Sequence, residues 1–169
     1  MNEKMNVGEI CNRTVVFGYR HMDVSEAARL MHEQHVGSIV VVEETENGRM
    51  VVGMLTDRDI CTGIVARDLD AKNVRVGDIM SESLITVRPR DSVNDTLKLM
   101  SRHGVRRIPV TNVQEVLVGI VSMDDLLEIV AEELHDLVQT IKSEKKREIS
   151  GKSRPNGKFH TTSGNSVRD

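Results

Sequence analysis

The stretch GMLTDRDI, from Gly53 to Ile60, returns in chemical outline as GIVSMDDL, from Gly119 to Leu126. Each string begins with glycine and two apolar residues, then places a hydroxyl three residues before an aspartate and ends on an apolar residue. One such string is unremarkable in a chain of this length. Two of them indicate that the sequence contains an internal repeat.

The repeat extends to both sides of these strings. A shift of 69 residues aligns VGEI (7–10) with VGDI (76–79), and VSEAARLM (24–31) with VNDTLKLM (93–100). Around the glycines the shift becomes 66, and the three-residue difference falls in the polar segment 43–51. Because surface loops tolerate insertions, this segment is predicted to be a hairpin loop. The chain is therefore an internal duplication.

Each copy has the pattern β-α-β-β-α. Apolar and β-branched runs predict the strands, and amphipathic spacing predicts the helices between them. Asp23 with Glu26, and Ser92 with Asp95, have the spacing of a helix N-cap and its third residue. The predicted strands are 14–17, 38–42 and 50–55 in the first copy, and 84–87, 107–111 and 116–121 in the second. The predicted closing helices are 57–67 and 124–141.

One copy is too small to cover its own sheet, so the two copies are expected to bury their sheets against each other. The predicted fold is α/β (α+β), with two β-α-β-β-α motifs packed sheet to sheet about a pseudo-two-fold axis. The predicted divisions are 1–70 for the first motif, 71–141 for the second, and 142–169 for a polar basic tail that is expected to be flexible.

Composition excludes several classes of protein. Of 169 residues, 38% are apolar, but no apolar run approaches the length of a membrane span. Cys11 and Cys61 form no CxxC pair, which is typical of a reducing compartment. With no apolar leader at its start, the chain is expected to be cytoplasmic. His32 and His35 lack the further ligands of a metal site, and no catalytic triad or Cys-His pair has family-like spacing, so we expect neither a metal nor catalysis.

Charge is divided unevenly along the chain. Residues 142–169 carry eight Lys or Arg and three Asp or Glu, a balance of +5. Since the net charge of the chain is −3, residues 1–141 carry a balance of −8. An acidic body is a poor surface for nucleic acid, which leaves only the tail as a nucleic-acid-binding alternative.

These motifs resemble those of a known family. The two opening strings, RRIPV (Arg106–Val110), LITVRPRDSV (Leu84–Val93) and the linkers VGEIC and VGDIM are similar to a tandem pair of cystathionine-β-synthase-type (CBS) domains, a Bateman module, over about residues 7–140. The resemblance implies a stand-alone regulatory module that needs no cofactor and binds AMP, ADP, ATP or S-adenosylmethionine between its copies. It also implies a homodimer that acts on an effector protein, which the sequence does not identify.

The repeated strings suit such a ligand. Thr56 and Asp59 are expected where a strand ends and a helix begins, and unpaired N–H groups there stabilise a phosphate. The Asp59 carboxylate can accept hydrogen bonds from ribose hydroxyls, while Ile39 and Val41 are expected to line a slot for the base. Ser122 and Asp125 form the corresponding second site. The alternative is that both hydroxyl–aspartate pairs are simply helix caps.

Basic residues distinguish the two sites. Arg58 can form paired hydrogen bonds with phosphate oxygens, whereas the second copy has Met123 and Asp124 at this place. The resemblance implies that Arg106 and Arg107 also reach the first site, so the second is expected to take a less anionic ligand or none. Phe17 stands where the second copy has a threonine, and it either stacks on a base or fills the slot. The remaining cleft positions implied by the resemblance are Ile85, Thr86, Ile108 and Pro109.

The predicted final helix is longer than its first-copy counterpart. Its apolar residues follow helical spacing at Leu126, Val130, Leu134, Leu137 and Ile141. The extra turns are expected to cover a second subunit. An alternative function uses this helix and the tail to dock a partner, with clefts that no longer bind ligand.

Overall fold

The computed structural model describes residues 5–149. The first copy comprises α1 (Val7–Ile10), β1 (Phe17–Tyr19), α2 (Val24–Glu33), β2 (Ser38–Thr45), β3 (Gly48–Thr56), α3 (Asp57–Gly63) and a 3-10 turn (Val65–Arg67). The second comprises α4 (Val76–Ile79), α5 (Val93–His103), β4 (Arg107–Thr111), β5 (Leu117–Ser122) and α6 (Met123–Ile149). The chain divides into two compact units, 1–130 and 131–169, and both copies with their sheets belong to the first.

The helix starts follow the predicted caps. The Asp23 side chain accepts a hydrogen bond from the Glu26 backbone N–H at 2.7 Å, and Ser92 accepts one from Asp95 at 3.4 Å. Such caps satisfy amide groups that have no partner inside the helix. The starts of α2 and α5 were therefore correctly predicted from the sequence.

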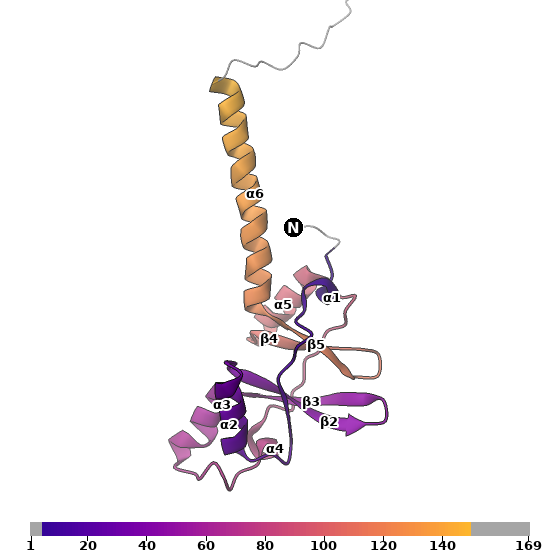
Figure 1. Ribbon diagram of the computed structural model, residues 1–169, viewed down its shortest axis with the longest axis vertical. Helices are drawn as coiled ribbons and strands as arrows, with labels where there is room; N and C mark the ends of the chain where they lie inside the picture. The colour runs from indigo at the N-terminus through magenta and orange to yellow at the C-terminus, as the bar shows by residue number, and fades with distance from the viewer. Residues whose placement is uncertain (1–4, 150–169) are drawn as a thin grey trace, which may run out of the picture. The chain divides into compact units, whose positions relative to one another are not determined.

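The two sheets confirm the predicted hairpins. β2 pairs with β3 and β4 with β5, both antiparallel, and β1 adds a parallel strand to β2 with Gly18 opposite Val41. In the second copy the matching pairing shrinks to one parallel bridge, Val87 to Val110. Figure 1 shows the β2–β3 and β4–β5 hairpins stacked next to each other in the first unit.

The predicted first strands, 14–17 and 84–87, are displaced from the observed pairing, because β1 begins only at Phe17. The chain just before each of them pairs with the other copy instead. Asn12 exchanges two backbone hydrogen bonds with Ile120 (2.8 and 2.9 Å), and Ser81 does the same with Met54 (2.9 and 3.1 Å). These segments therefore join one copy to the other.

The glycines of the opening strings make this exchange possible. A Cβ atom on Gly53 would lie 2.9 Å from the carbonyl oxygen of Ser81, and one on Gly119 would lie 3.1 Å from that of Asn12. Real Cβ atoms are essentially never within 3.0 Å of a backbone oxygen, and contacts up to 3.4 Å are tight. A side chain at either glycine would therefore force a shift where the linkers cross the strands.

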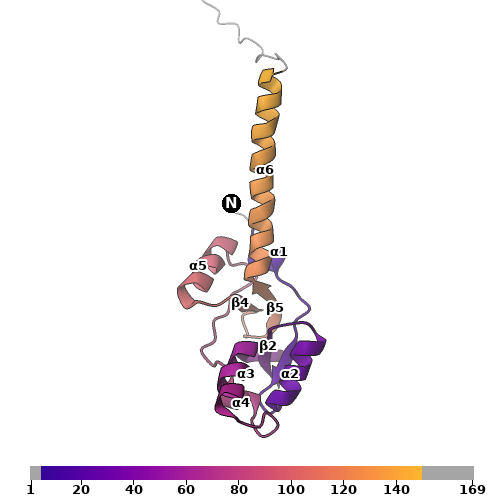
Figure 2. The same cartoon turned by 90° about the vertical axis from the view of Figure 1, so that its left-hand side faces the viewer.

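The leading helices are exchanged as well. The backbone N–H of Val7 in α1 donates to Asp91 of the second copy at 2.9 Å, whereas that of Val76 in α4 donates to Met22 of the first copy at 2.9 Å. Val7 is buried with Val93 and other second-copy residues, and Val76 with the first-copy core. Figures 1 and 2 show α4 beside α2 and α3, and α1 near α5. The packed halves therefore do not coincide with the sequence division at 70/71.

A third core cluster lies between the sheets and confirms the predicted sheet-to-sheet packing. Val40, Val42 and Val51 are its buried members, and Leu117 and Ile120 of the second copy pack against them. Burial of these aliphatic side chains supplies the main force holding the copies together.

Helix α6 is longer than predicted. It begins at Met123 and continues to Ile149, so residues 142–149 of the predicted tail are helical. Lysine, arginine and glutamate, which dominate these positions, are good helix formers, and this explains the extension. The rest of the predicted tail lies outside the described residues. Within residues 5–149 there is no helix sufficiently long and apolar for a membrane crossing.

Candidate functional site

The two hydroxyl–aspartate pairs have the same geometry. At the β3–α3 corner, Asp59 Oδ2 accepts hydrogen bonds from the backbone N–H of Thr56 (2.8 Å) and its Oγ1 (2.7 Å), while the Asp59 N–H donates to Thr56 Oγ1 (3.2 Å). At the β5–α6 corner, Ser122 and Asp125 repeat these contacts at 2.7, 2.6 and 3.2 Å. Both pairs therefore cap their helices, as the structural alternative predicts.

Capping does not use the whole carboxylate. Only Oδ2 of Asp59 and of Asp125 takes part, and Oδ1 of each has no hydrogen-bond partner among the described residues. Each carboxylate is half-buried and held in position by its capping hydroxyl. The free oxygen is thus a fixed acceptor at the head of the helix.

A cavity of about 660 Å³, called here the main cavity, opens at the β3–α3 corner. Its walls come from both copies: the corner itself, the linker around Ser81–Ile85, and the start of β4 with the residues before it. Ligand sites commonly enclose roughly 300–1,000 Å³ and combine apolar walls with a few polar groups. The main cavity has this size and composition, with Met54, Leu84 and Val105 among its apolar residues.

Three arginines give the main cavity a positive side. Arg106 pairs with Asp124 at 3.4 Å, but both side chains are largely exposed (73% and 64%), so this contact is weak. The side chains of Arg58 and Arg107 have no hydrogen bond or ion pair with any described residue. Asp57 also lines the cavity, and its carboxylate accepts a hydrogen bond from the Arg58 backbone N–H at 2.7 Å.

A second cavity of about 160 Å³ opens at the β5–α6 corner. Its walls repeat those of the main cavity through the duplication, because Asn12, Thr14, Val15 and Val16 correspond to Ser81, Ser83, Leu84 and Ile85. Arg107 is the one Lys or Arg among its lining residues. Its volume is below that of most ligand sites.

The structure gathers half of the sequence-predicted site residues at the main cavity. Those that line it are Thr56, Arg58, Asp59, Ile85, Arg106, Arg107 and Pro109. Ser122 and Asp125 line the second cavity, together with Arg107.

The predicted base-slot residues lie elsewhere. Ile39, Val41 and Ile108 are fully buried in the cores under the helices and line neither cavity. Successive residues of a strand face opposite sides, and it is Ser38 and Pro109 that face the cavities. The sequence predicted that side chains of β2 alternate between two faces, but it did not predict which face meets the cavity. Thr86 also lines neither cavity.

Phe17 belongs to an aromatic group on β1 instead of a ligand slot. Its ring meets Tyr19 edge-on (centroids 5.9 Å, 84°), and the Arg49 guanidinium lies 4.1 Å from its centroid. The Tyr19 hydroxyl donates to Glu44 at 3.0 Å, and this hydrogen bond raises the pKa of Tyr19 above its usual value. Phe17 lines neither cavity and is fully accounted for by these contacts.

Several cavity residues were missed from the sequence. Ser81, Ser83 and Leu84 come from the linker that crosses to the first copy, and Met54 from the strand it pairs with. The duplication relates each of them to a residue of the second cavity, by 69 residues for Ser81, Ser83 and Leu84 and by 66 for Met54. Without knowledge of the linker exchange, nothing indicated that these residues meet the corner of the opposite copy.

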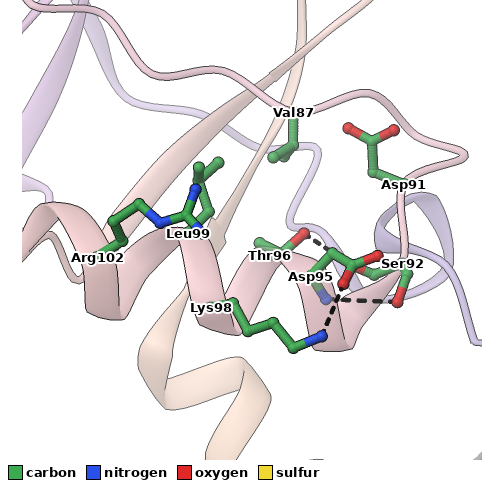
Figure 3. A pocket seen from close by; sticks show the side chains of 8 residues that line it. All are labelled: Val87, Asp91, Ser92, Asp95, Thr96, Lys98, Leu99 and Arg102. Carbon is green, nitrogen blue, oxygen red and sulfur yellow. Dashed lines mark hydrogen bonds and ion pairs between the residues drawn. The ribbon is translucent and has the colours of Figure 1, made fainter.

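Neither the cavity along α5 nor the His, Cys, Asp and Glu residues of the described chain form a further candidate site. A third cavity, of about 380 Å³, lies along α5 (Figure 3), but its polar groups are the Ser92 cap and an exposed Lys98–Asp95 pair at 3.1 Å. No sequence-predicted site residue lines it. Among the described residues, no group of three or more His, Cys, Asp or Glu is placed to hold a metal ion.

Comparison with known proteins agrees with this architecture. The family model for the CBS domain matches residues 7–66 and 76–132. An uncharacterized protein of Methanopyrus kandleri is 35% identical over 143 residues, which are 85% of this chain and 69% of that protein.

Two solved structures have the same fold. The hexameric CBS-CP12 protein of bloom-forming cyanobacteria has a TM-score of 0.66 and 25% identity, covering 88% of each chain. The CBS domain pair solved with 5-methylthioadenosine and S-adenosyl-L-methionine has a TM-score of 0.66 and 21% identity, covering 76% of this chain and 98% of that one. With two family matches on the two copies of its duplicated fold, this chain belongs to the CBS-domain family as a tandem pair.

Proposed function

We propose that the protein is a regulatory sensor that binds an adenosine-containing ligand in the main cavity and has no catalytic activity of its own. The carrying observation is a 660 Å³ cavity that joins a fixed carboxylate oxygen on Asp59 to the unpaired guanidinium groups of Arg58 and Arg107. A nucleotide has ribose hydroxyls to donate to the carboxylate and phosphate oxygens to accept from the guanidinium groups.

The apolar walls of the main cavity support a base as the remaining part of the ligand. Met54, Leu84, Ile85, Val105 and Pro109 offer an apolar surface to a flat base. A CBS pair of the same fold holds 5-methylthioadenosine and S-adenosyl-L-methionine, which supports an adenosine-type ligand here. The preference for AMP, ADP, ATP or S-adenosylmethionine then depends on how many negative charges the three arginines neutralise.

Regulation would follow from the mixed origin of the walls. Asp59 belongs to the first copy and Arg107 to the second, so a ligand that holds both favours one relative placement of the copies. A ligand shifts such an equilibrium only by its difference in affinity for the two placements. An effector protein that binds one placement better would then respond to the ligand.

Isothermal titration calorimetry with adenosine, AMP, ADP, ATP and S-adenosylmethionine tests this function. We expect at least one of them to bind with a dissociation constant in the micromolar range, about 8 kcal/mol of binding free energy. Failure of all five to bind below about millimolar would refute the sensor, since about 4 kcal/mol is too little for a dedicated site.

A second proposal concerns self-association through α6. In the unit 131–169, Leu134, Leu137 and Ile141 are exposed (59%, 63% and 57%) and follow the a–d–a spacing of a coiled-coil seam. Acidic residues precede this stripe and lysines follow it. Two copies of the helix packed antiparallel would cover the apolar stripe and bring opposite charges together, so we propose a second copy of this chain as the occupant.

Replacing both Leu134 and Leu137 with glutamate is expected to convert a dimer to a monomer, because four carboxylates would be buried in the seam. Sedimentation velocity measures the change. Val113→Glu is the control, since Val113 is an even more exposed apolar residue (80%) that precedes α6 in the sequence, and it should leave the dimer intact. A monomeric wild-type protein, or a double variant that still dimerises, would contradict self-association through α6.

A further inference from the structure

Two residues line both cavities: Ser38 and Arg107. Every other lining residue belongs to one cavity alone. The 69-residue shift of the duplication places Ser38 on Arg107, so they are the same position of the two copies. The shared position is thus occupied by a small neutral side chain in one copy and a long cation in the other.

This difference coincides with the unequal volumes of the two cavities. The main cavity lies at the β3–α3 corner of the first copy, and β2 of the same copy contributes Ser38 to it. The second cavity lies at the β5–α6 corner of the second copy, and β4 of that copy contributes Arg107. An arginine fills space that a serine leaves open, and the second cavity measures about 160 Å³ against about 660 Å³. In the second cavity, Arg107 thus stands at the place where the main cavity has the smaller Ser38.

Arg107 is free to leave it. The side chain is half-buried and makes no hydrogen bond or ion pair with the described residues, so no polar contact among them must break when it turns. It also supplies the only Lys or Arg charge of the second cavity, whereas the main cavity has Arg58 and Arg106 as well. One guanidinium group cannot serve both cavities at the same time.

We propose that Arg107 couples the two cavities. An anionic ligand in the main cavity draws the guanidinium group toward its phosphate, which widens the second cavity and removes its cation. The widened second cavity retains the Asp125 carboxylate and apolar walls, so it takes an uncharged nucleoside in preference to a nucleotide. By linkage, a nucleoside there raises the affinity of the main cavity for the anion by the same factor.

This inference rests on the proposed function but fails separately from it. AMP and adenosine are suitable probes, because they differ only in the phosphate. Calorimetry on the wild-type protein is expected to give one AMP per chain, one adenosine per chain when adenosine is added alone, and one further adenosine when the chain is already saturated with AMP. Binding of neither probe, with ADP, ATP and S-adenosylmethionine failing as well, would refute the proposed function itself; binding of one of those three with no adenosine in the second cavity would overturn the coupling alone. Binding of AMP with no further adenosine would overturn the coupling alone.

Substitution of Arg107 separates this residue from its neighbours. In Arg107→Ala the second cavity is open without AMP, so two adenosines per chain are expected, and AMP affinity should fall by about tenfold for the loss of one charged contact. Arg106→Ala is the matched control, because Arg106 lines the main cavity only. It should weaken AMP but leave adenosine at one per chain. An Arg107→Ala protein that still takes a single adenosine would overturn the proposal.

Discussion

Asp59→Ala is expected to weaken AMP binding by about 100-fold or more. The Asp59 carboxylate is held at the head of α3 through Oδ2, which leaves Oδ1 as an acceptor for the ligand. Each hydrogen bond to a charged group contributes roughly 1.5–3 kcal/mol. Loss of two ribose contacts therefore removes at least about 3 kcal/mol, which corresponds to slightly more than two orders of magnitude in the dissociation constant. Calorimetry of the purified variant gives this value directly.

The duplication supplies a control for this experiment within the same chain. Asp125→Ala removes the same two carboxylate contacts from the β5–α6 corner but leaves the main cavity unchanged. Both variants should lose about 1 kcal/mol of folding stability through the lost cap, as measured by urea unfolding. Only Asp59→Ala should show a lower affinity for AMP. Equal AMP affinity in the two variants would mean that both aspartates are caps and nothing more.

Gly53→Ala is expected to lower the free energy of unfolding by about 1–3 kcal/mol, the range for atoms forced into a well-packed place. The added Cβ would lie 2.9 Å from the Ser81 carbonyl oxygen and 2.9 Å from Met80 Sδ. The methionine can move, but Ser81 is held by its paired backbone hydrogen bonds to Met54. The linker must therefore shift, and since Ser81 and Met54 line the main cavity, AMP affinity should fall as well.

Gly63→Ala provides the comparison. Gly63 ends α3, and a Cβ there would meet Ile79 at 3.4 Å, an ordinary contact. Alanine restricts the unfolded chain more than glycine does, so this variant should equal the wild type or exceed it by up to about 1 kcal/mol. Urea midpoints of the two variants measure the difference. Gly53→Ala with unchanged stability would show that the linker crossing tolerates a side chain.

The sequence predicted whatever depends on local pattern and on the repeat. Caps at Asp23 and Ser92, both hairpins and the two hydroxyl–aspartate corners follow from residue spacing, and the structure has them. The face of β2 that meets a cavity could not be predicted, because alternation gives two faces without saying what covers each. Ile39 and Val41 were for this reason expected at the ligand, whereas they lie under α2.

Long-range exchange was likewise beyond the sequence. That Ser81 pairs with Met54, and Asn12 with Ile120, depends on backbone hydrogen bonds between distant segments, which leave no periodic pattern in the side chains. The glycines of the opening strings were visible, but their purpose was not. In the structure, each permits another segment to approach at van der Waals distance.

The swapped positions of α1 and α4 also bear on what a fragment of this protein can do. Either half, cut at the sequence boundary, would carry a helix that belongs to its sister and would expose the place where its own missing helix should lie. Such a fragment can obtain its missing helix only from another molecule. Two molecules that exchange their leading helices would each cover the exposed surface of the other. The ancestral single motif could therefore be complete as an intertwined pair, and fusing two genes would have turned a bond between molecules into one within a chain.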